Sequence, residues 1–79
     1  MATREQNERR FGQWEDLPDG GRRYWLDRAG VSGETARYVK IVDGSEQTVS
    51  IVQEIYDAMG NLVSVHQKHP ADTGHRQLR

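Results

Sequence analysis

The feature that most constrains the fold is a series of glycine-containing turn signals that divides the chain into short apolar runs. These signals lie at residues 18–21, 30–33, 43–44 and 57–61. Proline presets φ, glycine adopts positive φ, and aspartate hydrogen-bonds to the backbone beyond it, so each segment favours a turn. Turns at this spacing predict an antiparallel meander, because consecutive antiparallel strands need only short connections.

The runs between the turns predict four strands, at residues 22–29, 35–42, 48–56 and 62–69. Each run is rich in β-branched and aromatic residues and carries apolar side chains at both parities. Strands that are apolar on both faces are usually covered on both faces. Three arrangements are therefore open: a sheet that curls on itself, a sheet partly covered by the N-terminal arm, or a homodimer.

The two ends of the chain are more polar than its middle. This contrast divides the chain into an N-terminal arm (1–10), an antiparallel β domain (11–69) and a polar C-terminal tail (70–79). Thr3 and Gln6 match a capping box, so the arm is either unfolded or a short helix that begins at Arg4. Pro70 cannot donate a ladder hydrogen bond and ends the fourth strand. The predicted fold class is β-dominated, either all-β or small α+β.

The charge balance and composition exclude several classes of partner. The chain has 79 residues, of which 11 are basic and 12 acidic, and its net charge of −1 provides no field that recruits nucleic acid. It contains no cysteine, which excludes disulfides and thiolate metal sites. No apolar run reaches the ~20 residues of a membrane span, and the first residues lack an apolar signal core. We expect a cytoplasmic protein without a membrane partner or cofactor.

The three histidines, His66, His69 and His75, all lie within residues 66–79. Imidazole binds zinc, so the three could form a metal site. Residues three apart on a strand point to opposite faces, however, so His66 and His69 converge only if the strand ends or bulges between them. Because of this spacing, we predict no metal site and treat the histidines as surface residues.

The same region suggests a metal-independent nuclease as an alternative. Such an enzyme needs a base, an acid and a cation beside the phosphate. His66 and His75 would supply the acid and base, Arg76 the cation, and Glu54 would approach His66 as a cross-strand pair. An ordinary surface charge pair between Glu54 and His66 or Lys68 is the competing interpretation.

A second cluster places basic residues beside aromatic ones in the first two predicted strands. It consists of Arg22, Arg23, Tyr24, Trp25, Arg28 and Arg37. This combination can clamp single-stranded nucleic acid by stacking and charge. Asp27, Glu34 and Asp43 dilute the charge, so core aromatics flanked by solvated arginines are the interpretation that we favour.

Residues 56–63, which read Tyr-Asp-Ala-Met-Gly-Asn-Leu-Val, resemble one unit of the Tyr-Asp (RHS-type) repeat. The resemblance implies a hairpin in which Tyr56 and Leu62 flank a turn that Asp57 caps and Gly60 permits. A single unit does not imply the long shells that many copies build. A longer stretch is similar to small bacterial domains that accompany polymorphic-toxin and phage-associated genes, which implies a bacterial or phage origin. Its matching residues are Glu54, His66, Pro70, Asp72, Gly74 and His75.

Together these patterns favour a small non-enzymatic binding or accessory module that acts through protein–protein interaction. Its expected surface is the aromatic side of the sheet or an open strand edge. The residues expected on this surface are Trp25, Tyr38, Tyr56, Arg23 and Arg37. A nuclease that uses the C-terminal histidines and a weak nucleic-acid binder are the alternatives.

Overall fold

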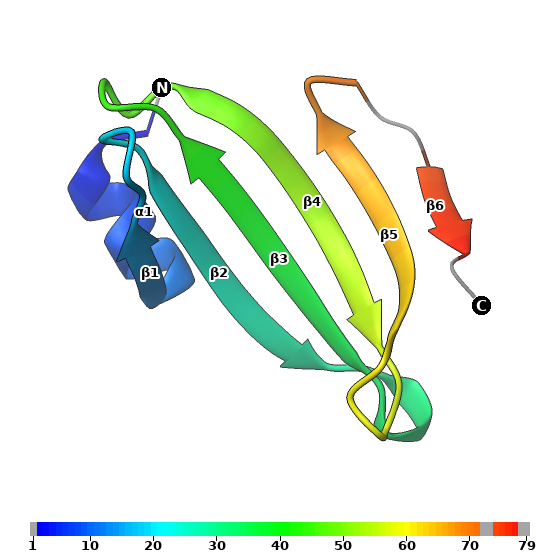
Figure 1. The fold of residues 1–79 in the computed structure, drawn as a ribbon. Helices are drawn as coiled ribbons and strands as arrows, with labels where there is room; N and C mark the ends of the chain where they lie inside the picture. The colour runs from blue at the N-terminus through cyan, green and yellow to red at the C-terminus, as the bar shows by residue number, and fades with distance from the viewer. Residues whose placement is uncertain (1, 72–73, 78–79) are drawn as a thin grey trace.

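The protein is a single antiparallel sheet with one helix on one side, as a computed structural model covering residues 2–71 and 74–77 shows (Figure 1). Within those residues, six strands follow one another in chain order across the sheet. The elements are α1 (Arg4–Phe11), β1 (Gln13–Asp16), β2 (Arg22–Ala29), a 3-10 turn (Val31–Gly33), β3 (Thr35–Val42), β4 (Thr48–Tyr56), β5 (Leu62–His69) and β6 (Gly74–Gln77). The predicted meander of about four strands is confirmed in β2 to β5.

Aspartate and glycine form the predicted turns between these strands. The Asp57 carboxylate accepts hydrogen bonds from the backbone N–H groups of Met59 and Asn61, at 3.0 and 2.9 Å. Gly60 in the same turn has φ of 87°, a conformation that glycine adopts without a steric penalty. Asp43 caps the turn between β3 and β4 in the same way, through the N–H of Ser45 at 2.8 Å. Local chemistry therefore determines where the chain reverses.

The cross-strand register sorts the side chains onto two faces of the sheet. We call the side on which α1 lies the helix face and the other side the far face. Tyr24, Lys40 and Ile51 form one row of the helix face, because Lys40 pairs with both of the others. The next row belongs to the far face and contains Trp25, Val39 and Val52. Both faces are partly apolar, as the sequence predicts.

The N-terminal arm forms a helix that covers one end of the helix face. Thr3 and Gln6 form the predicted capping box, and the helix ends because Gly12 adopts a left-handed conformation with φ of 80°. The Phe11 ring centroid lies 5.8 Å from that of Tyr24, which is fully buried. Of the three open arrangements, partial coverage by the N-terminal arm is therefore present.

The structure adds one short strand at each edge of the predicted meander. β1 pairs with β2, and β6 pairs with β5. β5 ends at His69, before Pro70, as the missing N–H of proline predicts. Residues 72, 73, 78 and 79 of the predicted tail lie outside the described residues. No helix in the described part of the chain is long and apolar enough to cross a membrane.

Candidate functional site

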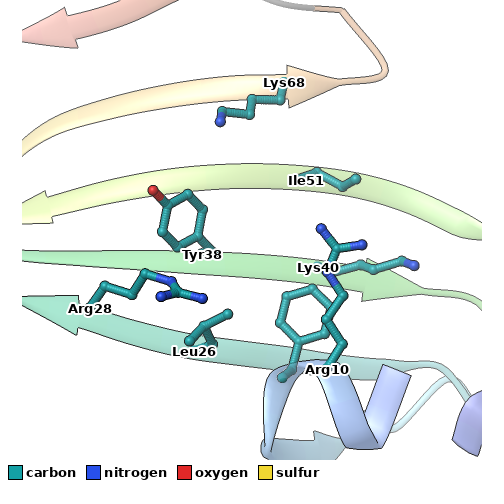
Figure 2. A pocket seen from close by; sticks show the side chains of 8 residues that line it. Arg10, Leu26, Arg28, Tyr38, Lys40, Ile51 and Lys68 are labelled. Carbon is teal, nitrogen blue, oxygen red and sulfur yellow. The ribbon is translucent and has the colours of Figure 1, made fainter. Parts of the chain in front are cut away.

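The helix face contains a groove of about 450 Å³ between α1 and β5 (Figure 2). Its apolar part is formed by Phe11, Leu26, Tyr38 and Ile51, which come from α1, β2, β3 and β4. The remaining lining residues are all cations: Arg10, Arg28, Lys40 and Lys68. No carboxylate lines this groove among the residues that the structure describes. The surface therefore combines an apolar floor with a basic rim.

A β-bulge places the last of these cations, Lys68, over the groove. Ile51 pairs with His69 and Val52 pairs with Gln67, so Lys68 is an extra residue without a direct partner in β4. Bulges redirect side chains in this way. The Lys68 ammonium lies 5.5 Å from the centroid of the Tyr38 ring, within the range of a cation–π contact.

The four cations form two pairs at opposite ends of the apolar floor. Figure 2 shows Arg10 extending from α1 toward Lys40, while Arg28 and Lys68 lie at the end that contains Tyr38. Burial lowers the pKa of Lys40, and the nearby positive charge of Arg10 lowers it further, while the charge of Glu46 opposes them without outweighing them. Both effects disfavour the charged ammonium, so an anion at this end would stabilise it.

The groove cations differ from the other arginines of the sheet in their ion pairing. In the described part of the chain, none of the four forms an ion pair, whereas Arg4, Arg22, Arg23 and Arg37 each do. Four cations without a direct carboxylate partner around an apolar floor repel one another in the free protein. Such an arrangement is typical of a binding site for a negatively charged group.

The helix that forms one wall of the groove is held by a polar cluster around Glu46, which we call the Glu46 cluster. It consists of Glu46, Asn7, Tyr24, Lys40 and Arg4. The Asn7 amide donates to the Glu46 carboxylate and accepts from the Lys40 ammonium, both at 2.9 Å. The Tyr24 hydroxyl also donates to Glu46. Asn7 and Tyr24 are buried, so these contacts replace their hydration.

The electrostatics of this cluster favour a charged Glu46 and a neutral Tyr24. Burial acts to raise the pKa of Glu46, but hydrogen bonds from Tyr24, Asn7 and Arg4 outweigh it and lower that pKa. Burial and the adjacent Glu46 carboxylate raise the pKa of Tyr24. Glu46 itself has φ of 66°, an uncommon value for a residue with a side chain.

A second ion-pair cluster ties α1 to the first two strands. The buried Arg22 guanidinium donates to Glu8 of α1 at 2.7 Å and to Asp16 of β1 at 2.8 Å. Burial acts to lower the pKa of Arg22, but the two carboxylates outweigh it and raise that pKa. Arg22 therefore has a structural position and is not available to a nucleic-acid strand.

The structure places the expected aromatic binding surface on two different faces. Trp25, Tyr56, Arg23 and Arg37 lie on the far face, while Tyr38 lies on the helix face and lines the groove. The Arg23 guanidinium lies 4.8 Å from the Trp25 ring centroid, and that of Arg37 lies 5.3 Å from the Tyr56 centroid. The far-face members therefore contact one another.

A charged row crosses the far face beside these aromatic residues. Arg37 donates to both oxygens of Asp27, at 2.7 and 3.0 Å, and this contact lowers the pKa of Asp27. The Tyr56 hydroxyl donates to Glu54 at 2.9 Å. Burial raises the pKa of Tyr56, and Glu54 raises it further. In the part of the chain that the structure describes, Arg23 and Arg37 on this face have carboxylate partners, unlike the groove cations.

The residues considered for nuclease chemistry fall into two separate rows. Glu54 pairs with Val65, which pairs with Arg76, whereas His66 pairs with Gln53 on one side and His75 on the other. Glu54 therefore does not form the expected cross-strand pair with His66: adjacent rows belong to opposite faces. The side chains of His75 and Arg76 lie outside what the structure describes.

His69, the third histidine considered as a metal ligand, pairs with Ile51 at the end of β5. Among the residues that the structure describes, no three histidine, cysteine or carboxylate side chains gather closely enough to hold a metal ion.

The sequence patterns single out Arg28 and Tyr38 as members of basic or aromatic clusters and Lys68 only as a possible partner of Glu54, and they do not point to Arg10 or Lys40. The rim cations come from α1, β2, β3 and β5, so no local motif contains them. One available signal is the alternation in β3, where Tyr38 and Lys40 share a face that is otherwise apolar.

Comparison of the chain with protein-family models, curated proteins and solved structures finds no match. The groove of the helix face is therefore the feature of the molecule that points to a function.

Proposed function

We propose that this protein is a non-enzymatic binding module that acts through protein–protein interaction, with the basic groove of the helix face as its binding site. One observation carries this proposal: four cations without ion-pair partners, among the described residues, surround a shared apolar floor. Ligand sites typically combine an apolar lining with a few polar groups that orient the ligand. A volume of about 450 Å³ falls within their usual range.

The chemistry of the rim supports binding of an anion. Arginine and lysine supply donors and positive charge, and the exposed Arg10, Arg28 and Lys68 are accessible to a partner. The apolar floor adds affinity when a ligand covers it. A cytoplasmic location, a bacterial or phage setting and a homodimer are further parts of this proposal, and they rest on the sequence patterns.

Titration of the ¹⁵N-labelled protein with an acidic glutamate–tyrosine copolymer tests the proposal. We expect amide shifts concentrated at the groove residues of α1, β2, β3 and β5. The double substitution Arg10→Gln with Arg28→Gln should weaken binding about tenfold, since each partly exposed charge pair is worth ~0.5–1 kcal/mol.

Arg9→Gln is the matched control, because Arg9 lies beside Arg10 in the last turn of α1 but does not line the groove. It should leave the affinity within about twofold of the wild type. Shifts spread over both faces of the sheet, or equal weakening by the control, would contradict the proposal.

A further inference from the structure

We infer, on the basis of the proposed function, that the ligand is a short acidic segment of a partner protein with an apolar side chain between two groups of carboxylates. The pattern follows from the arrangement of the groove. Arg10 and Lys40 lie at one end, Arg28 and Lys68 lie at the other, and the apolar floor lies between them (Figure 2). A matching ligand carries its negative charges at its two ends.

The end formed by Arg10 and Lys40 has no carboxylate in direct contact with either cation among the described residues, although the charge of Glu46 acts on Lys40 from a distance. The Lys40 ammonium donates to the neutral amide oxygen of Asn7 at 2.9 Å, while Glu46 is occupied by Asn7, Tyr24 and Arg4. The partly buried Lys40 and the exposed Arg10 are adjacent cations and repel each other. A carboxylate between them would gain two charge-assisted contacts and relieve that repulsion.

The opposite end of the groove also carries two cations, and both of them are exposed. Arg28 and Lys68 are both exposed, and Lys68 lies over the Tyr38 ring. Leu26 and Tyr38 are cross-strand partners, so they form one continuous patch beside these cations. This patch fits an apolar side chain of the ligand, and neighbouring carboxylates would reach Arg28 on one side of Tyr38 and Lys68 on the other (Figure 2).

The rings of the groove favour a peptide over a single-stranded nucleic acid. Stacking of bases requires a free aromatic face. The Lys68 ammonium contacts the Tyr38 ring. The Phe11 ring contacts both the Tyr24 ring and the Arg10 guanidinium, and the central carbon of that guanidinium lies 5.9 Å from the Phe11 centroid. Neither ring therefore presents a clear platform for a base.

The distribution of charge over the protein also favours a short acidic peptide over a nucleic acid. A polyphosphate chain continues beyond four cations, but the chain as a whole has a net charge of −1. Glu5 and Glu8 lie on α1, and Asp16 follows on β1. Glu8 and Asp16 share the Arg22 guanidinium, which leaves Glu5 to repel a long polyanion, whereas a short acidic segment ends within the basic rim.

Four six-residue probes test the inference by isothermal titration calorimetry. Three are acetylated and amidated peptides: EDLFDE, EDEDLF with the same composition, and the neutral QNLFNQ. The fourth is hexathymidylate. We expect EDLFDE to bind about tenfold more tightly than EDEDLF, because only the former places carboxylates at both ends of the floor. QNLFNQ and hexathymidylate should bind more weakly than either acidic peptide.

A variant at one end of the groove tests whether that end binds the carboxylates of the peptide. Arg28→Gln should reduce the affinity for EDLFDE about threefold and so narrow its advantage over EDEDLF, and Arg9→Gln should leave both affinities unchanged. If the copolymer binds the groove but the two acidic peptides bind equally well, or hexathymidylate binds more tightly than they do, this inference is overturned and the proposed function stands. Loss of copolymer binding in the wild type would instead refute the proposed function.

Discussion

Removing the Glu46 carboxylate tests how α1 is held against the sheet. In the structure this carboxylate accepts hydrogen bonds from the Tyr24 hydroxyl, the Asn7 amide and the Arg4 guanidinium. Tyr24 and Asn7 are only 0% and 1% exposed, so Glu46→Ala leaves two buried donors without this acceptor. The variant should therefore lower the free energy of unfolding more than an ordinary surface substitution does.

The magnitude follows from the number and burial of these contacts. A hydrogen bond to a charged group contributes roughly 1.5–3 kcal/mol, and the half-exposed Arg4 pair contributes under about 1 kcal/mol. The three contacts share one carboxylate and are not additive, so we expect a total of about 3 kcal/mol. A small domain is stable by about 5 kcal/mol or a little more, so this loss is large.

Glu46→Gly separates the side-chain contribution from that of the backbone. Glu46 has φ of 66°, where alanine is strained and glycine is not. Glu46→Gly should therefore be less destabilising than Glu46→Ala by about 1 kcal/mol, although it removes the same carboxylate.

Urea unfolding followed by tryptophan fluorescence measures both variants. With a slope near 1–1.5 kcal/mol/M, Glu46→Ala should lower the midpoint by about 2 M or more. A loss below about 0.5 kcal/mol, the range of ordinary surface substitutions, would refute the role assigned to the Glu46 cluster.

Two further predictions concern the loops and the pH dependence. Gly21→Ala should destabilise the fold by about 2 kcal/mol, because the new Cβ would lie 2.4 Å from the Val42 carbonyl oxygen. Gly44→Ala is the control: its Cβ meets no atom closer than 3.5 Å, so the variant should be tolerated. Thermal unfolding of both variants measures the difference. Because Glu46 has a lowered pKa in the folded state, its contribution is complete above pH 4.5, the ordinary value, and is lost as the pH falls through the folded-state pKa. Urea unfolding at pH 7 and pH 3 should show a smaller acid-induced loss in Glu46→Gln than in the wild type; equal losses would contradict this assignment.

The four central strands were predictable because their signals are local. Turn chemistry at Asp43 and Gly60 and the alternation within each run depend on residues close in sequence. The edge strands have weaker local signals, and residues 11–17 were compatible with either a short strand or an irregular arm. β1 is four exposed residues, and it forms because Asp16 and Trp14 meet β2 beside the buried Arg22 and Tyr24. Tertiary contacts therefore determine the edges of the sheet.

Most of the candidate site could not be predicted from the sequence, for a related reason. Lys68 lies over Tyr38 only because β4 and β5 shift register between Ile51 and Val52. Glu46 binds Asn7, which is 39 positions away in the chain. Register shifts and loop contacts of this kind depend on the assembled sheet, and no residue spacing encodes them.

The geometry couples the Glu46 cluster to the binding groove. α1 supplies Arg10 and Phe11 to the groove, and Asn7 of the same helix joins Glu46 to the groove residue Lys40. If α1 leaves the sheet in a fraction of molecules, the apparent affinity for an acidic ligand falls in proportion to the fraction that remains competent. Glu46→Gln should therefore weaken binding of EDLFDE without altering a lining residue. By the same linkage, the peptide should slow hydrogen exchange of the α1 amides, and unchanged exchange at saturation would show that the helix and the groove act independently.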